Sequence, residues 1–269
     1  MSEPSGPAYG EYDRADEHAF PDDRLHEVLD RVAEDPEIAA YIAAQNVNPV
    51  TRLGYNDHGH KHVEIVRSRA LSLYDLLKRG GVEFDGATDH GIDEADEAVI
   101  ICLGAMLHDI GHVVHRDNHS HWSVPLASQL LDRFLSELYD IDQLVAIKGE
   151  VLHAIISHHS DQQPLTREAG VVRVADALDM ERGRSREPYE SGGRGINTVS
   201  SQAIERVNLY EGAEVPVQVE IEMTNAAGVY QVDELLKSKL DGSRLEDFVR
   251  IVGVNVSTDG AQIVERIEL

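Results

Sequence analysis

A long apolar segment of the chain ends in an adjacent histidine and aspartate, His108 and Asp109. The segment, ADEAVIICLGAMLHDIG, is apolar on nearly every side, which predicts a central, buried helix. An aspartate at the buried end of a helix is costly unless it is paired with a cation or binds a metal ion. The surrounding sequence is poor in basic residues, so these two side chains indicate a divalent metal ion as the partner.

Further side chains that ligate metals are spread over other predicted helices. His58 and His62 lie four residues apart at the start of a helix and therefore share a face. Asp176 lies inside another apolar helix, VVRVADALDM, and is a second buried acid in need of a partner. A single histidine on a helix is more often packed or solvated than bound to metal. Helical bundles, however, build metal sites from one or two ligands on each of several helices, and this pattern favours such a site.

The order of these residues resembles a known family. His62, the pair His108–Asp109 and Asp176 are similar to the H…HD…D signature of the HD-domain metal-dependent phosphohydrolases. The resemblance covers about residues 50–190 and includes the segments HVEIV, AMLHDIGH and VVRVADALDMERGR. HRDNH through LASQLL, and AIISHH, also resemble the additional histidines of two-metal members, among them HD-GYP cyclic-dinucleotide phosphodiesterases and HD diadenosine-polyphosphate hydrolases. The following segment, SDQQPLTREAG, departs from the HD-GYP pattern, which disfavours a cyclic dinucleotide substrate.

The resemblance implies two groups of metal ligands and places His108 and Asp109 as the catalytic pair. The implied ligands are His62, His108, Asp109 and Asp176 for a first ion, and Asp109 with His119, His158 and His159 for a second. His121 is the alternative to His119. Imidazole and carboxylate ligands suit Mn, Fe, Co, Ni or Zn, so we expect one or two divalent transition-metal ions per chain. Such ions activate a water molecule for attack on phosphorus.

Other histidines and arginines could contact the substrate. His58 lies one turn before His62 and could touch metal or substrate, or cap a loop. Three arginines follow Asp176 closely: Arg182, Arg184 and Arg186. A guanidinium group is planar and can donate two hydrogen bonds to one phosphate, so these residues could bind the substrate. The alternative interpretation is that they form salt bridges with acidic residues on the surface. His112 and His115 follow Gly111 and could support the site from outside or belong to a lid.

These features predict a metal-dependent phosphohydrolase that acts on a small phosphomonoester or phosphodiester, most simply a nucleotide. The alternative is a non-catalytic, metal- or nucleotide-binding regulatory module. A complete ligand set favours the enzyme, because a sensor has no need of both acids.

The elements that must position these residues are mainly helical. We expect a flexible N-terminal arm over residues 1–20, an HD-type helical domain over 21–195, and a small α+β domain over 196–269, through which the chain could form a homodimer. Alternation in VPVQVEIEM, FVRIVGVNV and AQIVERIEL predicts strands, and YQVDELLKSKL is helical. NPVTRLGYNDHG and GVEFDGATDHGIDE are expected to be loops.

The composition restricts where the protein works and what it binds. There are 24 basic and 49 acidic residues, a formal net charge of −25, which argues against general binding to a nucleic-acid backbone. A dispersed acidic excess with few lysines is typical of proteins adapted to high salt, so we interpret the chain as that of a halophilic archaeon. A single cysteine, Cys102, and the absence of a signal peptide or membrane segment predict a cytoplasmic protein.

Overall fold

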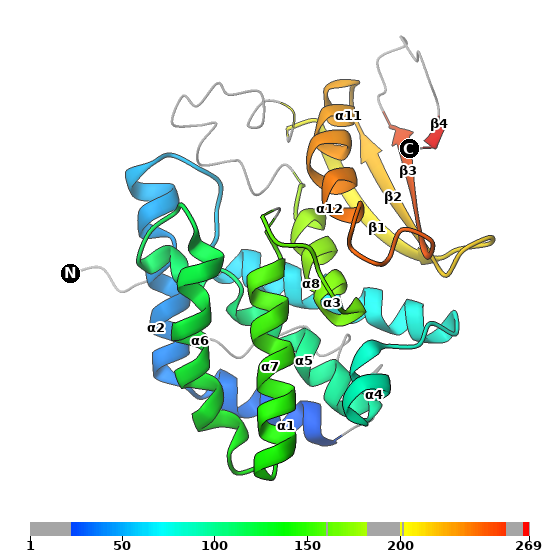
Figure 1. Ribbon diagram of the computed structural model, residues 1–269. Coiled ribbons are helices and arrows are strands. Elements are labelled where there is room, and N and C mark those ends of the chain that lie inside the picture. The colour runs from blue at the N-terminus through cyan, green and yellow to red at the C-terminus, as the bar shows by residue number, and fades with distance from the viewer. Residues whose placement is uncertain (1–22, 160, 182–199, 201, 257–265, 269) are drawn as a thin grey trace.

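The computed structural model describes residues 23–159, 161–181, 200, 202–256 and 266–268. Over these residues the chain is mainly α-helical with a small α+β part at the C-terminus, which confirms the predicted fold class (Figure 1). The predicted N-terminal arm and the expected domain boundary near residue 195 lie outside the described residues. Every helix in the described part is too short or too polar to span a lipid bilayer.

The helical part is built from eight α-helices and two short irregular helical turns in the described region. They are α1 (Asp23–Ala33), α2 (Pro36–Ala44), the π-helical turn η2 (Val47–Arg52), α3 (His60–Arg79), α4 (Asp85–His90), α5 (Glu94–Leu107), the 3-10 turn η3 (Ile110–Val113), α6 (His119–Leu135), α7 (Ile141–Ser157) and α8 (Arg167–Leu178).

Helix α5 is the centre of the bundle. From Ala95 to Leu107 every residue is buried, and the helix contacts α1, α3, α7 and α8. The side chain of Asp93 caps its first turn by accepting a hydrogen bond from the Asp96 amide. This confirms the predicted central helix, and it places the end of α5, with His108 and Asp109, deep among the other helices.

The C-terminal part is a four-stranded sheet with one helical segment. The strands are β1 (Ile204–Glu211), β2 (Val217–Met223), β3 (Val249–Asn255) and β4 (Arg266–Glu268), in the order β1-β2-β3-β4. β2 and β3 are parallel, and the other two pairs are antiparallel. The parallel pair is joined through α11 (Ala227–Gln231), the π-helical turn η5 (Val232–Lys237) and α12 (Ser238–Leu240).

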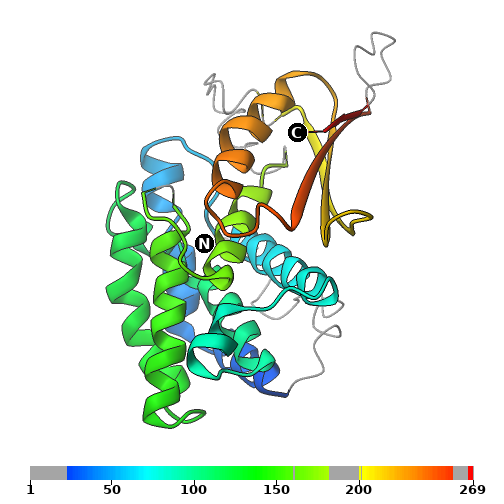
Figure 2. The same ribbon diagram turned by 45° about the vertical axis from the view of Figure 1, so that its right-hand side comes forward.

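This helical crossover lies between the sheet and the helical bundle (Figure 2). Alternate residues of β2, from Val217 to Met223, are buried, while those between them are partly exposed. η5 and α12 contact α8, and α3 contacts β1 and β2. Buried residues of both parts therefore form one continuous hydrophobic core.

Two segments expected to be loops contain short helices. Val47–Arg52 forms the turn η2, where the side-chain amide of Asn48 donates to the His112 carbonyl at 2.6 Å. Asp85–His90 forms α4, which ends at Gly91 in the left-handed conformation (φ 66°). Tertiary hydrogen bonds of this kind stabilise turns that residue spacing does not reveal.

Candidate metal centre

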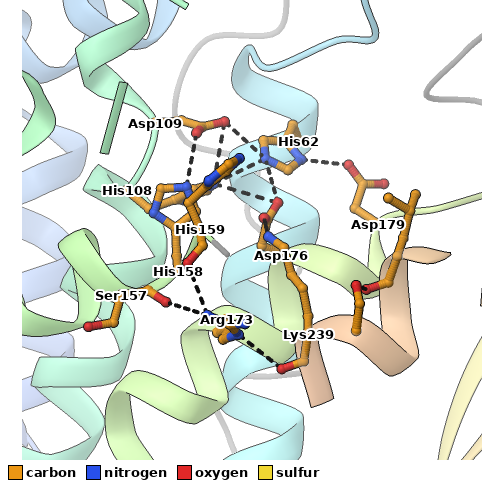
Figure 3. Close-up of polar contacts among 12 residues, drawn as sticks. His62, His108, Asp109, Ser157, His158, His159, Arg173, Asp176, Asp179 and Lys239 are labelled. Atoms are coloured by element: carbon orange, nitrogen blue, oxygen red, sulfur yellow. Dashed lines mark hydrogen bonds and ion pairs between the residues drawn. The ribbon is translucent and has the colours of Figure 1, made fainter. Parts of the chain in front are cut away.

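The predicted ligands of the first ion lie together at one end of the bundle (Figure 3). His62 comes from the first turn of α3, His108 and Asp109 directly follow α5, and Asp176 lies on α8. The His62 Nε2 atom is 3.2 Å from His108 Nε2, 3.4 Å from Asp109 Oδ2 and 3.4 Å from Asp176 Oδ1. Donor atoms that bind the same ion at bond lengths of about 2.1 Å lie roughly 3.0–3.4 Å apart. The observed spacing therefore suits one transition-metal ion bound by all of these donors.

A second group of donors faces the other carboxylate oxygen of Asp109. Asp109 Oδ1 lies 3.2 Å from His119 Nε2, 3.6 Å from His158 Nε2 and 3.6 Å from His112 Nε2. The Nε2 atoms of His119 and His158 are 3.1 Å apart. Asp109 thus presents one oxygen to each group, the arrangement needed for a carboxylate that bridges two ions.

The turn after α5 brings these groups together. η3 begins directly after Asp109, and the Ser123 hydroxyl accepts from the Gly111 amide and donates to the His108 carbonyl. A Cβ atom on Gly111 would lie 2.0 Å from the His119 carbonyl oxygen. Only glycine allows α6 to begin this close to η3, and this approach delivers His119 to the site.

Hydrogen bonds on the side of each histidine ring that faces away from the site determine which ring nitrogen carries a proton. Nδ1 of His108 lies 2.8 Å from the Ala105 carbonyl oxygen, that of His119 3.0 Å from Arg116, and that of His158 2.7 Å from Ile155. A carbonyl can only accept, so each Nδ1 carries a proton, and Nε2 is the ring nitrogen that faces the site.

The close approach of the Nε2 atoms of His119 and His158 supports a cation between them. His119 and His158 oppose two Nε2 lone pairs at 3.1 Å, and two lone pairs repel unless a proton or a metal ion lies between them. Burial lowers the pKa of His158 well below its ordinary value, and the neighbouring rings of His108 and His119 lower it further. A proton is therefore disfavoured, and a divalent ion is the partner that these residues fit.

Asp109 is held in its ionised form, which is the form of a carboxylate that binds a metal ion. Burial alone would raise its pKa, but the surrounding rings of His108, His112 and His58 outweigh burial and hold the pKa of Asp109 well below its ordinary value. His58 was expected one helical turn before His62, but it lies outside α3, which begins at His60; its Nδ1 lies 2.7 Å from Asp109 Oδ2.

His112 also faces Asp109 Oδ1, and with His58 and Asp109 it forms a further possible ligand group. Its ring stacks on His119 with centroids 4.1 Å apart, and both ring nitrogens are buried without a hydrogen-bond partner. Burial lowers the pKa of His112 to about 2, so the ring is neutral. A buried imidazole with unsatisfied nitrogens next to Asp109 is an additional candidate ligand that the sequence assigned only to a supporting or lid role.

The remaining predicted residues lie less centrally. His119 is buried and points into the second group, whereas His121 is exposed. The His159 side chain is 43% exposed, and its Nδ1 lies 3.3 Å from Asp161 Oδ1. No ligand group within the described part of the chain includes His159. Arg182, Arg184 and Arg186 lie outside the described residues.

Two residues that the sequence analysis missed contact the ligands. Asp179 Oδ2 lies 2.6 Å from His62 Nδ1 and orients that ring as the carbonyls orient the others. The Lys239 amine contacts Asp176 Oδ2 from α12. Asp179 carried a usable signal, because it is another acid in the apolar segment VADALDM; Lys239 carried none.

Comparisons with known proteins agree with this geometry. The sequence model of the HD domain matches residues 81–181. The chain is 38% identical to the uncharacterized protein MJ1020 of Methanocaldococcus jannaschii over 83% of this chain and 86% of that protein. It is 32% identical to ribonuclease Y of Thermoanaerobacter pseudethanolicus and 36% identical to that of Desulforamulus reducens. These alignments span 61% and 62% of this chain but only 26% and 31% of those proteins. The chain therefore belongs to the HD-domain superfamily of metal-dependent phosphohydrolases.

Proposed function

We propose that this protein hydrolyses a phosphomonoester or phosphodiester of a small nucleotide with the help of two transition-metal ions. The observation that carries the proposal is the carboxylate of Asp109, whose Oδ2 faces the Nε2 atoms of His62 and His108 and whose Oδ1 faces those of His119 and His158. A regulatory module that only bound nucleotide would not need this paired arrangement.

The proposed ligands fall into two sets, according to which carboxylate oxygen of Asp109 they face. His62, His108 and Asp176 would hold one ion with Oδ2, and His119 and His158 would hold the other with Oδ1. His112 and His159 are candidates for a further ligand of the second ion. Mn, Fe, Co, Ni or Zn suits these donors. When bound, such a pair supplies an activated water and neutralises charge on the phosphate oxygens.

The chain's own residues prepare the site for that chemistry. Acceptors on the far sides of His62, His108, His119 and His158 hold the proton on Nδ1, so each ring turns its Nε2 toward the position of a metal ion. His58 holds the Asp109 carboxylate in place through a 2.7 Å contact. We propose that it also borders the substrate, and that Arg182, Arg184 and Arg186 contribute phosphate contacts.

The acidic surface supports a small substrate over a long one. The relatives named ribonuclease Y suggest RNA, whose phosphodiester bonds suit the same ions. A chain of net charge −25 repels a polyanion along its surface, while a nucleotide needs only the site itself. The same charge and the single cysteine support a salt-rich, reducing cytoplasm as its location.

The test is hydrolysis by Mn-loaded protein in molar KCl. Bis-p-nitrophenyl phosphate, p-nitrophenyl phosphate, a nucleotide panel and an oligoribonucleotide are compared for wild type, Asp109→Ala and the surface control Asp75→Asn. We expect wild type and control to hydrolyse a nucleotide and Asp109→Ala to be inactive. Nucleotide binding without turnover of any ester would support the regulatory module, and preferred cleavage of the oligonucleotide would contradict a small substrate.

A further inference from the structure

Lys239 enters the metal centre from the C-terminal part of the chain. Its amine contacts Asp176 Oδ2, while Asp176 Oδ1 faces His62 and His108 (Figure 3). The ammonium therefore occupies the outer oxygen and leaves the inner one for a metal ion. With side chains only 15% and 13% exposed, Lys239 and Asp176 form a largely buried pair.

A buried arginine fixes the backbone that carries this lysine. Arg173 Nε donates to the Lys239 carbonyl at 3.0 Å. The same guanidinium donates through Nη1 to the carbonyls of His159 and Gln162, both at 2.9 Å. One side chain thus joins α12 to the segment directly after α7 that carries His158, so the position of Lys239 is coupled to that of a ligand.

A close backbone approach presses the same C-terminal segment onto α8. A Cβ atom on Gly170 would lie 2.0 Å from the Ser243 carbonyl oxygen, so a larger residue there would displace one of the two segments. α8 carries Gly170, Arg173 and Asp176 at spacings of three residues, which places them along one side of the helix. The C-terminal part is therefore docked along the side of α8 that leads to the metal ligands.

The ammonium of Lys239 lies directly beside the metal ligands, because its partner Asp176 faces His62 and His108. A phosphate ester brought to this site adds negative charge next to the carboxylates of Asp109 and Asp176. A lysine ammonium is a compact charge with three rotatable donors, and it can turn from a carboxylate oxygen to a phosphate oxygen without moving its backbone.

We infer that Lys239 is a phosphate-binding residue of this centre, supplied by the C-terminal α+β part, so that this part completes the active site rather than serving only as an appended interface. The inference rests on the proposed function for the identity of the ligand as a phosphate ester.

The test compares Lys239→Met with Lys237→Met, which removes the same charge from an exposed position two residues away. Inorganic phosphate is titrated calorimetrically into each Mn-loaded protein, and Mn²⁺ is titrated separately into each metal-free protein. Loss of one charge-assisted hydrogen bond should weaken phosphate binding by roughly 10- to 100-fold in Lys239→Met. Mn²⁺ should bind as tightly as to wild type or more tightly, because a like charge beside Asp176 is gone. Lys239→Arg should restore most of the phosphate affinity.

Two results would overturn the inference. Equal phosphate affinity in Lys239→Met and Lys237→Met would show that the ammonium does not bind phosphate. Loss of Mn²⁺ together with phosphate would make Lys239 a residue that only positions Asp176.

Wild-type protein gives a check that does not depend on folding of a variant. Phosphate should slow acetylation of Lys239 by acetic anhydride severalfold, relative to Lys237, in the Mn-loaded protein. Equal labelling with and without phosphate would contradict the inference. A protein that binds Mn²⁺ and phosphate but hydrolyses no ester would refute the proposed function and leave the role of Lys239 intact.

Discussion

Replacing Asp179 with asparagine should weaken the first metal site while leaving the protein folded. The Asp179 carboxylate accepts the Nδ1 proton of His62 at 2.6 Å, and its side chain is only 3% exposed. The asparagine carbonyl can accept the same proton, so the ring keeps its tautomer. The substitution therefore removes the negative charge behind the ring and keeps an acceptor for its Nδ1 proton.

The size of the effect follows from that lost charge. A carboxylate behind a ligating imidazole raises the basicity of the ring, and loss of such a partner typically costs 10- to 100-fold in metal affinity. At about 1.4 kcal/mol per factor of ten, this is about 1.4–2.7 kcal/mol. Only the ion beside His62 should be affected, because His119 and His158 are oriented by backbone carbonyls.

Calorimetric titration with Mn²⁺, and Co²⁺ absorption as a probe of geometry, would measure both sites. Asp75→Asn is the matched control, since Asp75 lies on the same helix, α3, and pairs with Arg79 on the surface. We expect one weakened and one unchanged Mn²⁺ site in Asp179→Asn, and two unchanged sites in Asp75→Asn. Wild-type affinity at both sites of Asp179→Asn would refute the assignment of His62 as an oriented ligand.

Four further perturbations have defined outcomes. Asp109→Ala should abolish hydrolysis and release both ions, because both sites share this carboxylate; retention of two ions in elemental analysis would contradict the bridge. His158→Ala should weaken the second ion more than the first in Mn²⁺ titrations, and the opposite order would reverse the ligand assignment. Burial raises the pKa of Glu168 to about 7 from 4.5, so the folded chain retains a proton that the unfolded chain releases, and stability should fall as pH rises through this window. Glu168→Gln should flatten that fall in urea melts and add up to about 3 kcal/mol above pH 7; an unchanged slope would exclude Glu168 as its source. The melting temperature should rise with KCl, because the screening length falls from about 30 Å at 0.01 M to about 3 Å at 1 M, and a flat or falling series would refute the halophilic interpretation.

The central helix and most of the first ligand group could be predicted from sequence. A fully apolar segment that ends in His108–Asp109 has few structural solutions, since the acid must be buried and must also be compensated. Helical periodicity likewise indicated the faces of α3 and α8 that carry His62 and Asp176. His119 could not be separated from His121 by spacing alone. The choice depends on the start of α6, which is set by the close approach at Gly111.

Contacts between distant segments account for what the sequence did not reveal. His112 faces Asp109 because η3 turns its ring onto His119, and that turn depends on a hydrogen bond between Asn48 and the His112 carbonyl. Lys239 lies 63 residues beyond Asp176 in a helix that looks like an ordinary amphipathic crossover. Only the docking of that crossover onto α8 brings the two side chains together.

The metal content of the purified protein tests the two-metal centre most directly. Elemental analysis of protein prepared without chelator, combined with anomalous diffraction at the metal edges, would count the ions and locate them. A two-metal centre predicts two transition-metal ions per chain, with Asp109 between them and His62 and His158 on opposite sides. Protein without bound metal, and without activation by added Mn²⁺, Co²⁺ or Ni²⁺, would contradict it.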